Sequence, residues 1–327
     1  MFHKRGAGLI PLTDHSVSPS GFEMKKHPAS VIRIEAPAKI NLFLEVTGDR
    51  PDGYHNLATL FAKISLADGL TLKKTEKPGV SLKVVNKANL KPLKTGDNIV
   101  YKAAMAFFEA FKINPAVEIT LVKKIPVGAG LGGGSSDAAA ALKGLCRLYG
   151  VNADKNIKKL RAAALALGSD VPFFLTRGAF SAGTGRGELL TPVKSKGRLP
   201  VIILVYPGVP VYTGPVYKAL KPVAAFETAG NIKKFKLLIK ALQAGKPLND
   251  WGRLLFNRLE EPVLPRYEAV RRAKEDLIKA GAASVLMSGS GASVFALSED
   301  RASADKISKI IKKSNRKVFL VDFLLKS

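Results

Sequence analysis

The chain of 327 residues contains one cysteine, Cys146, and only 26 acidic residues against 52 basic ones. A single cysteine excludes an intramolecular disulfide and a cysteine-cluster zinc site. Long apolar runs are also missing: a stretch such as 201–206 is far shorter than the ~20 residues that a membrane-spanning helix needs. No sustained apolar segment follows the early positive charges, so a secretory signal is disfavoured. We therefore expect a soluble, cytoplasmic protein without a membrane partner.

The shortage of acidic residues leaves a formal net charge of +26, which raises nucleic acid or an anionic substrate as a partner. The basic residues are dispersed, however, and in segments such as 232–246 they lie at helical spacing beside apolar residues. This pattern is typical of solvated helix faces. The aromatic residues are not interleaved with the cations, as a stacking surface for single strands requires. The pattern favours solvated faces over a dedicated nucleic-acid surface.

Apolar residues make up 46% of the sequence, so a chain of this length can fold as two domains with buried cores. Residues 1–29 show no periodicity and are expected to be a loose extension. We expect the domains at 30–190 and 191–327. The periodicity predicts strands at 31–36, 40–47, 57–66, 70–74, 80–85, 117–122, 201–206, 284–287, 293–297 and 317–323, a turn at 48–53, and helices at 98–111, 136–149, 157–167, 232–244, 267–280 and 302–314. The fold class is therefore α+β.

The segment PVGAGLGGGSSD, at 126–137, is the most informative part of the chain. Successive glycines let a backbone approach a ligand closely and turn its N–H groups inward. The predicted helix that follows presents free N–H donors and the positive end of its dipole. Ser135 and Ser136 could cap this helix or contact phosphate and a magnesium ion. The segment therefore predicts a phosphate cradle.

Two commoner phosphate-binding loops do not fit this segment. A Walker loop requires a lysine after its last glycine, and the position after Gly133 is another glycine. Gly128, Gly130 and Gly133 match the Gly-x-Gly-x-x-Gly pattern, but a dinucleotide-binding fold also requires a strand that ends in an acidic residue after the helix. A second helix is predicted there instead. A flexible linker is a poor interpretation of glycines placed between a strand and a helix.

The glycine segment resembles the phosphate loop of the GHMP superfamily of small-molecule kinases. Two further signatures occur in the expected order, APAKINL at 36–42 and MSGSGASV at 287–294. GDRPDGYHNL at 48–57 and LGSDVPF at 167–173 are similar to the 4-diphosphocytidyl-2-C-methyl-D-erythritol kinase branch. The resemblance extends from Val31 to the end of the chain. It implies a ribosomal-protein-S5-like amino-terminal domain and a ferredoxin-like carboxy-terminal domain.

The resemblance implies phosphorylation of the substrate's 2-hydroxyl from ATP, with Mg²⁺, in the non-mevalonate (MEP) isoprenoid pathway. Asp170 and Lys39 match the family's catalytic residues. A carboxylate near the acceptor hydroxyl can orient it and take its proton, and a neighbouring cation keeps that carboxylate ionised. From the sequence alone, Asp170 could instead cap a turn or a short helix, and Lys39 could be an exposed strand lysine. The small and apolar neighbours of Lys39 argue against exposure.

The acceptor site is expected to lie beside this pair. Asn41, two residues after Lys39, should share its strand face. Tyr54 and His55 follow a turn and suit a cytosine ring, and Tyr217 matches a family aromatic that closes the other side. No metal ligand can be assigned. The expected site residues are Lys39 and Asp170 for catalysis; Pro126, Val127, Gly128, Ala129, Gly130, Leu131, Gly132, Gly133, Gly134, Ser135 and Ser136 for ATP; and Asn41, Tyr54, His55, Thr213 and Tyr217 for the substrate.

Two other interpretations remain open. The chain could be another GHMP kinase, acting on mevalonate or homoserine, but those substrates carry no cytosine for the loop at 52–55. It could also be a basic nucleic-acid-binding protein built on an S5-like domain. Lys39, Asp170 and the glycine segment together argue against that second possibility.

Overall fold

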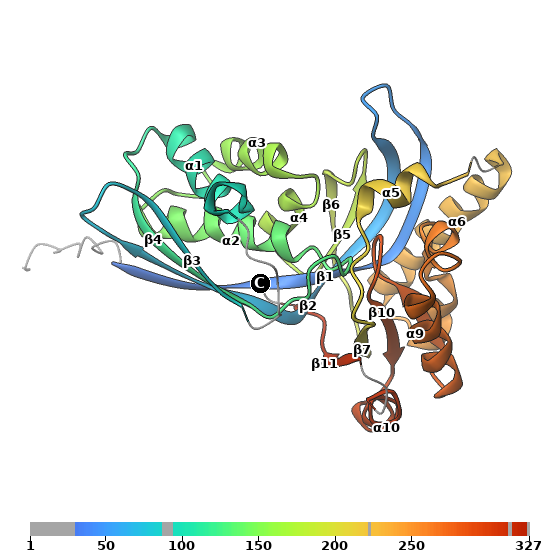
Figure 1. Cartoon of the computed structure of the whole chain (residues 1–327). Helices are drawn as coiled ribbons and strands as arrows, with labels where there is room; N and C mark the ends of the chain where they lie inside the picture. Colours follow the sequence, from blue (N-terminus) through green and yellow to red (C-terminus); the bar gives the residue numbers. More distant parts are fainter. Residues whose placement is uncertain (1–29, 87–93, 222–223, 313–315, 326–327) are drawn as a thin grey trace, which may run out of the picture.

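The structure is a computed structural model that describes residues 30–86, 94–221, 224–312 and 316–325. The extension expected at 1–29 lies outside the described residues, as do the last two residues of the helix expected at 302–314. The described chain forms two β-sheets with helices packed on them, which is the α+β architecture that the periodicity predicts (Figure 1). No helix within the described ranges is both long enough and apolar enough to cross a membrane.

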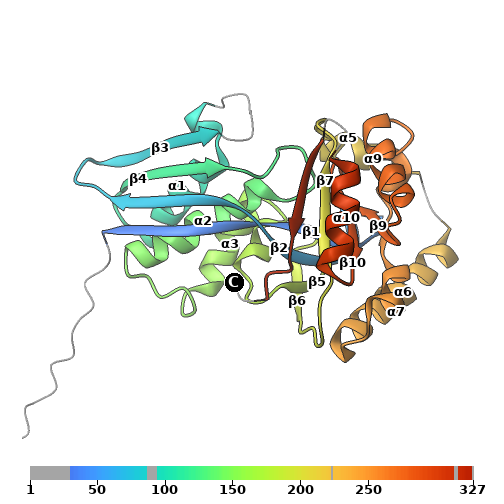
Figure 2. The ribbon, with the colours of Figure 1, turned by 90° about the horizontal axis from the view of Figure 1, so that it is seen from below.

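The first sheet is mixed, with the order β3-β4-β2-β1-β8 and with β5 joining β2 to β6. Its strands are β1 (Val31–Asp49), β2 (His55–Lys74), β3 (Gly79–Asn86), β4 (Ala116–Lys123), β5 (Phe180–Thr184), β6 (Leu189–Val193) and β8 (Phe256–Asn257). Four helices accompany it, α1 (Ile99–Phe111), α2 (Gly133–Leu148), α3 (Ile157–Leu167) and α4 (Val171–Leu175). Figures 1 and 2 show α1, α2 and α3 on one face of this sheet, where their apolar residues close a core.

The two long strands differ from the sequence prediction. Strand β1 is continuous where the pattern predicts two strands, because a bulge between Pro37 and Lys39 shifts the register without ending the strand. A proline is tolerated at such a bulge. Strand β2 likewise replaces two predicted strands, those at 57–66 and 70–74. The predicted turn is confirmed, since Gly53 N donates to Arg50 O at the tip of the β1–β2 hairpin.

The second sheet is antiparallel, with the order β11-β7-β10-β9. Its strands are β7 (Val201–Tyr206), β9 (Ser284–Met287), β10 (Val294–Ser298) and β11 (Lys317–Val321). Ile202 and Leu204 of β7 face one apolar cluster, whereas Ile203 and Val205 face another that includes residues of α9 (Glu268–Lys279) and α10 (Arg301–Ile311). Strand β7 is therefore buried on both faces, which explains its uninterrupted apolar sequence.

The remaining elements are mostly short, and the sequence analysis missed them. They are α5 (Thr213–Lys218), α7 (Leu248–Trp251), α8 (Glu260–Val263) and the 3₁₀ turns Thr95–Asp97 and Gly252–Leu254. Helix α4 and the β5–β6 hairpin were also missed, because four to six residues show too little periodicity. Helix α6 (Ala225–Ala244) begins seven residues before the predicted start, since its exposed first turns carry no apolar pattern.

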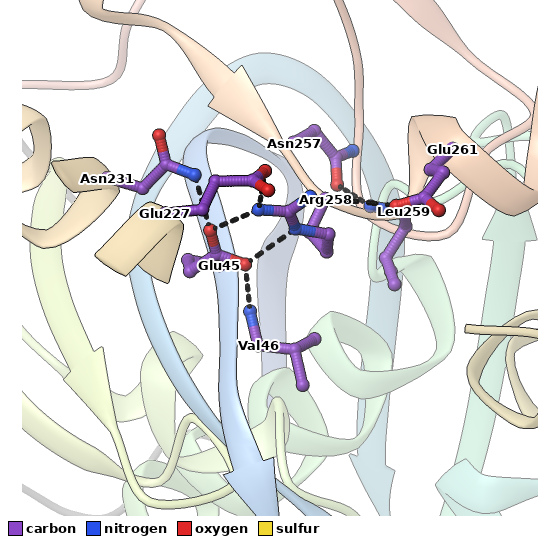
Figure 3. A network of polar contacts seen from close by, with 8 residues as sticks. All are labelled: Glu45, Val46, Glu227, Asn231, Asn257, Arg258, Leu259 and Glu261. Carbon is purple, nitrogen blue, oxygen red and sulfur yellow. Dashed lines mark hydrogen bonds and ion pairs between the residues drawn. The ribbon is translucent and has the colours of Figure 1, made fainter. Parts of the chain in front are cut away.

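The two halves of the chain are joined through β8, which pairs in parallel with β1 at Phe43 and Leu44. The division of the chain after residue 190 stays a prediction. Next to β8, the Glu45 carboxylate is fully buried and accepts hydrogen bonds from Arg258 Nε at 2.8 Å and from Asn231 Nδ2 at 2.7 Å (Figure 3). Arg258 also pairs with Glu227. This cluster ties β1 to α6 and to the segment after β8.

We expect Arg258→Met to destabilise the protein by about 3–5 kcal/mol, because it leaves the Glu45 carboxylate buried without its cation. Replacing Glu45 by Met as well should recover most of the loss. The measurement is urea-induced unfolding. Arg177→Met is the control, because the Arg177–Asp154 pair is exposed and should contribute at most about 1 kcal/mol. Equal losses for the Arg258 and Arg177 variants would contradict this account.

Candidate functional site

One cavity of about 1020 Å³ takes in nearly all of the predicted site. Residues 126–135 line it, whereas Ser136 is buried in the first turn of α2. The predicted catalytic and substrate residues also line it, namely Lys39, Asn41, Tyr54, His55, Asp170, Thr213 and Tyr217. The structure therefore brings residues from β1, β2, α4 and α5 to the glycine segment.

Three alternate glycines give the segment its shape. Gly128, Gly130 and Gly132 have φ values of +64°, +72° and +65°, which residues with a side chain rarely adopt. A Cβ on Gly130 would lie 2.0 Å from Ser288 O. A Cβ on Gly132 would lie 3.0 Å from Lys39 Cγ and 3.1 Å from Phe174 Cζ. Both positions therefore require glycine for their backbone angle and for their close packing.

The carboxy-terminal glycine motif at 287–294 holds the glycine segment by donating hydrogen bonds to carbonyl oxygens of that segment. Ser288 Oγ donates to Gly130 O at 3.0 Å, and Ser293 N donates to Ala129 O at 3.0 Å. The sequence analysis identified this motif but assigned it no site residue. In the structure its Gly289 and Ser290 line the cavity.

Helix α2 begins at Gly133, three residues before the predicted start. Gly132 is its N-cap and, having no side chain, cannot satisfy the first N–H groups of the helix. These donors and the helix dipole are suited to an anion at the cavity wall. The prediction of the start was wrong because a run of glycines carries no helical pattern.

Lys39 and Asp170 lie next to each other in the cavity. Lys39 is 5% exposed, and its Nζ donates to Asn41 Oδ1 at 2.8 Å and lies 3.5 Å from Asp170 Oδ2. Lys39 and Asn41 share a strand face, as predicted, and Asn41 Nδ2 donates to Thr59 Oγ1 at 2.8 Å. Asp170 precedes α4, but among the described residues its side chain makes no capping hydrogen bond. The capping interpretation of Asp170 is therefore not supported.

Lysines also lie at the other end of α4. Lys63, directly opposite Lys39 on β2, donates from Nζ to Thr176 O at 2.6 Å, and Lys143 donates to Phe174 O at 3.4 Å. Burial and, to a smaller extent, the neighbouring Lys143 lower the pKa of Lys63 to about 7. Both side chains donate to carbonyl oxygens at the carboxy-terminal end of α4, which lack partners within the helix. Helix α4, and with it Asp170, is thus held between two cross-strand lysines.

A second buried cluster lies beneath the glycine segment, and the sequence analysis did not select it. Lys123 Nζ bridges Asp68 and Asp137, with 2.6 Å to Asp137 Oδ2. Asp68 also accepts from Ile125 N at 2.9 Å. Lys123 and Asp68 are 55 residues apart in the chain, so no local pattern could pair them. The cluster fixes the start of α2 against β2 and β4.

The aromatic residues form the other end of the cavity. Figure 1 shows α5 beside the strands of the β1–β2 hairpin, below its tip. His55 and Tyr217 stack there with ring centroids 5.0 Å apart, and His55 Nδ1 lies 2.8 Å from Asp49 Oδ1. Burial and, less strongly, the Asp170 carboxylate raise the pKa of the Tyr217 hydroxyl. Tyr54 was expected to face the cytosine from the side opposite Tyr217, but its ring packs against Arg186, and His55 is the residue that stacks on Tyr217. Thr213 Oγ1 lies 3.0 Å from Ser290 Oγ.

The start of α2 also offers oxygen atoms to a metal ion. Ser136 Oγ and Asp137 Oδ1 are buried, and neither has a hydrogen-bond partner in the part of the chain that the structure describes. Burial raises the pKa of Asp137 to about 8 despite the opposing Lys123 ammonium. The described residues contain no cluster of three His, Cys, Asp or Glu side chains. A magnesium ion here would take most ligands from phosphate and water.

Comparisons with known proteins agree on one family. The family models for the GHMP kinases N terminal domain and the GHMP kinases C terminal domain match residues 98–178 and 238–317. The 4-diphosphocytidyl-2-C-methyl-D-erythritol kinase of Lachnoclostridium phytofermentans is 38% identical, covering 84% of this chain and 91% of its own. For the enzyme of the same name from Pelotomaculum thermopropionicum, the identity is 39% and the coverage is 89% and 97%.

Solved structures give the same result. A crystal structure of 4-(cytidine 5'-diphospho)-2C-methyl-D-erythritol kinase is 33% identical, with a TM-score of 0.67, and covers 89% of this chain and 99% of that one. Homoserine kinase from Cytophaga hutchinsonii reaches a TM-score of 0.69 at 22% identity, covering 92% and 96%. At that identity the likeness shows the shared two-domain fold alone.

We expect Gly132→Val to abolish nucleotide binding in a folded protein, because valine is strained at this φ and its branched side chain would obstruct the approach of the phosphates. Isothermal titration with ATP measures the effect. Gly230→Ala in α6 is the control, since a Cβ there meets no atom of the described residues within 4 Å and position 230 is not part of the cavity lining, so ATP affinity should stay within about threefold. Unchanged ATP affinity in Gly132→Val would place the phosphate cradle elsewhere.

Proposed function

The chain belongs to the 4-diphosphocytidyl-2-C-methyl-D-erythritol kinase family of the GHMP kinases, and we propose that its cavity transfers the γ-phosphoryl group of ATP to the 2-hydroxyl of that substrate. The reaction belongs to the MEP pathway of isoprenoid synthesis. The observation that carries the residue assignments is the Lys39–Asp170 pair, which shares one cavity with the glycine segment. A location in the cytoplasm stays a prediction.

Asp170 acts on the acceptor hydroxyl in this proposal. Its carboxylate is one-third exposed to the cavity side, so it can accept the hydroxyl proton as the oxygen attacks phosphorus. The Lys39 ammonium, held by Asn41, stabilises that carboxylate and the charge that develops on the transferred group. Lys39 N also donates to Leu131 O at 2.9 Å, which fixes the catalytic pair relative to the phosphate loop.

ATP occupies the glycine segment with its phosphates at the start of α2. Aliphatic residues beyond that point, Leu82, Val84, Ile99 and Leu121, provide an apolar wall for the adenine. The buried Ser136 hydroxyl, which has no hydrogen-bond partner among the described residues, would help to hold Mg²⁺, and the ion would supply neutralisation of the charge on the phosphates. The protein orients the acceptor oxygen toward the γ-phosphoryl group and excludes water from between them.

The aromatic end takes the cytosine. His55 and Tyr217 already form a stacked pair, and a base can stack on such a surface for about 1–3 kcal/mol. The contact between His55 and Asp49 fixes the imidazole, whose edge can then hydrogen-bond the base. Mevalonate and homoserine have no base to place there. No observation favours those substrates or a nucleic acid over the cytidine compound.

The proposal is tested by incubating the purified protein with ATP and Mg²⁺ and measuring ADP release with each acceptor. We expect turnover with 4-diphosphocytidyl-2-C-methyl-D-erythritol, and at most background with mevalonate or homoserine. Comparable turnover with either of those two acceptors would overturn the substrate assignment.

We expect Asp170→Asn and Lys39→Met each to lower kcat at least about 100-fold, because both groups act on the acceptor hydroxyl and on the charge that forms there. ATP affinity should stay within about threefold, since the phosphates bind the glycine segment. Steady-state kinetics and ATP titration measure the two effects. The control is Asp154→Asn, at an exposed carboxylate paired with Arg177, which should turn over like the unmodified protein. An Asp170→Asn variant with unchanged kcat would remove Asp170 from the mechanism.

A further inference from the structure

The turn between β5 and β6 brings Arg186 to the cavity. Gly185 and Gly187 on either side of it have φ values of +64° and +99°, and Gly187 N donates to Thr184 O at 3.0 Å to close the turn. Leu57 N donates to Gly185 O at 2.7 Å, which attaches the turn to the start of β2. Arg186 is therefore held by the backbone beside the residues that follow the hairpin tip, and its side chain lines the cavity.

The Arg186 guanidinium is held in place, but its capacity to donate hydrogen bonds is not fully used. Its Cζ lies 4.5 Å from the centroid of the Tyr54 ring, and 22% of its side chain is exposed. Nε is buried and has no hydrogen-bond partner among the residues that are described. The neighbouring carboxylate of Glu188 lies 3.8 Å from Nε at Oε1, and its Oε2 accepts from Arg186 N at 2.5 Å. A buried cationic donor without an acceptor is costly, which points to an anionic ligand.

The position of Arg186 along β2 shows which part of a ligand it would meet. Thr59 connects through Asn41 to the Lys39–Asp170 pair, whereas His55 belongs to the aromatic end. Thr59 follows His55 by four positions along the strand, a span of about 13 Å. The backbone of the Arg186 turn is bonded to Leu57, midway between the two. A ligand with its base at His55 and its reacting hydroxyl at Asp170 would pass Arg186 with its middle part.

The other cations that line the cavity differ from Arg186. Lys39 and Lys123 are engaged by Asp170 and Asn41 and by Asp68 and Asp137, respectively. Lys218 of α5 is exposed. A planar guanidinium also presents parallel N–H donors that match phosphate oxygens, which an ammonium does not. Arg186 is thus the cavity cation that is best placed for a second phosphate group besides those of ATP.

We propose that Arg186 binds the diphosphate of the acceptor, a cytidine diphosphate ester, and so selects acceptors with an anionic linker between base and hydroxyl. This inference rests on the proposed function. Tyr54 supports the guanidinium from one side through its ring, and Glu188 holds the backbone of the turn. When the diphosphate is bound, the guanidinium gains phosphate oxygens as hydrogen-bond acceptors.

The test compares cytidine and CDP as probes, with saturating ADP present so that the glycine segment is occupied. The unmodified protein should bind CDP at least about tenfold more tightly than cytidine, equivalent to ~1.4 kcal/mol. Arg186→Gln should reduce this ratio to within about twofold while leaving cytidine affinity nearly unchanged. Arg186→Lys, which keeps the charge but loses the fork, should give an intermediate ratio. In turnover assays Arg186→Gln should raise the acceptor KM with kcat and the ATP KM unchanged.

Arg50→Gln is the control for a general effect of positive charge, because Arg50 lies in the adjoining hairpin turn and pairs with Asp52 at 2.9 Å. Its CDP-to-cytidine ratio should match that of the unmodified protein. An unchanged ratio in Arg186→Gln, or an equal loss in Arg50→Gln, would overturn the assignment of Arg186 while leaving the proposed function intact. Failure of the unmodified protein to bind cytidine or CDP would instead overturn the proposed function, and this inference with it.

Discussion

The close contact between two glycine-rich segments is the constraint on which the site depends. Gly130 meets the backbone of Ser288 so closely that a Cβ would lie 2.0 Å from the carbonyl oxygen. This contact joins the phosphate loop, which follows β4, to a motif that lies about 160 residues later, between β9 and β10. Because the same loop accepts from Lys39 N through Leu131 O, the nucleotide site and the catalytic pair share one backbone frame.

Buried cations with defined partners complete that frame. Lys39 faces Asp170, Lys63 meets the end of α4, and Lys123 bridges Asp68 and Asp137 below the phosphate loop. Each amino group is held by oxygen atoms, so its position is set before a ligand arrives. The overall charge of +26 adds a long-range attraction for anionic substrates such as nucleotides. The site thus combines buried lysines in fixed positions with a positive electrostatic field that attracts anions.

The sequence predicted the parts of the site that lie in local motifs. The glycine segment, the shared face of Lys39 and Asn41, and the turn before Tyr54 follow from residue types and spacing alone. The roles of Asp170 and Tyr217 came from the family resemblance. The sequence did not indicate Lys123 with Asp68, because their contact spans 55 residues. Arg186 was also missed. It lies in the turn of the β5–β6 hairpin, whose strands have only five residues each, too few to show a clear alternation of apolar and polar residues. The bulge at Pro37 and the glycines at the start of α2 are the reason why the sequence pattern predicted the wrong limits for β1 and α2.

The most direct test of this account is the ATP affinity and kcat of Gly130→Ala beside those of Gly230→Ala. Alanine at position 130 must either move the Ser288 backbone or shift the phosphate loop, so we predict that ATP affinity and kcat both fall at least about tenfold, ~1.4 kcal/mol each. Gly230→Ala, in α6 and outside the cavity lining, meets no atom of the described residues within 4 Å and should change neither quantity appreciably. A folded Gly130→Ala protein with unchanged ATP affinity and kcat would contradict the claim that the contact between the two glycine segments positions the site.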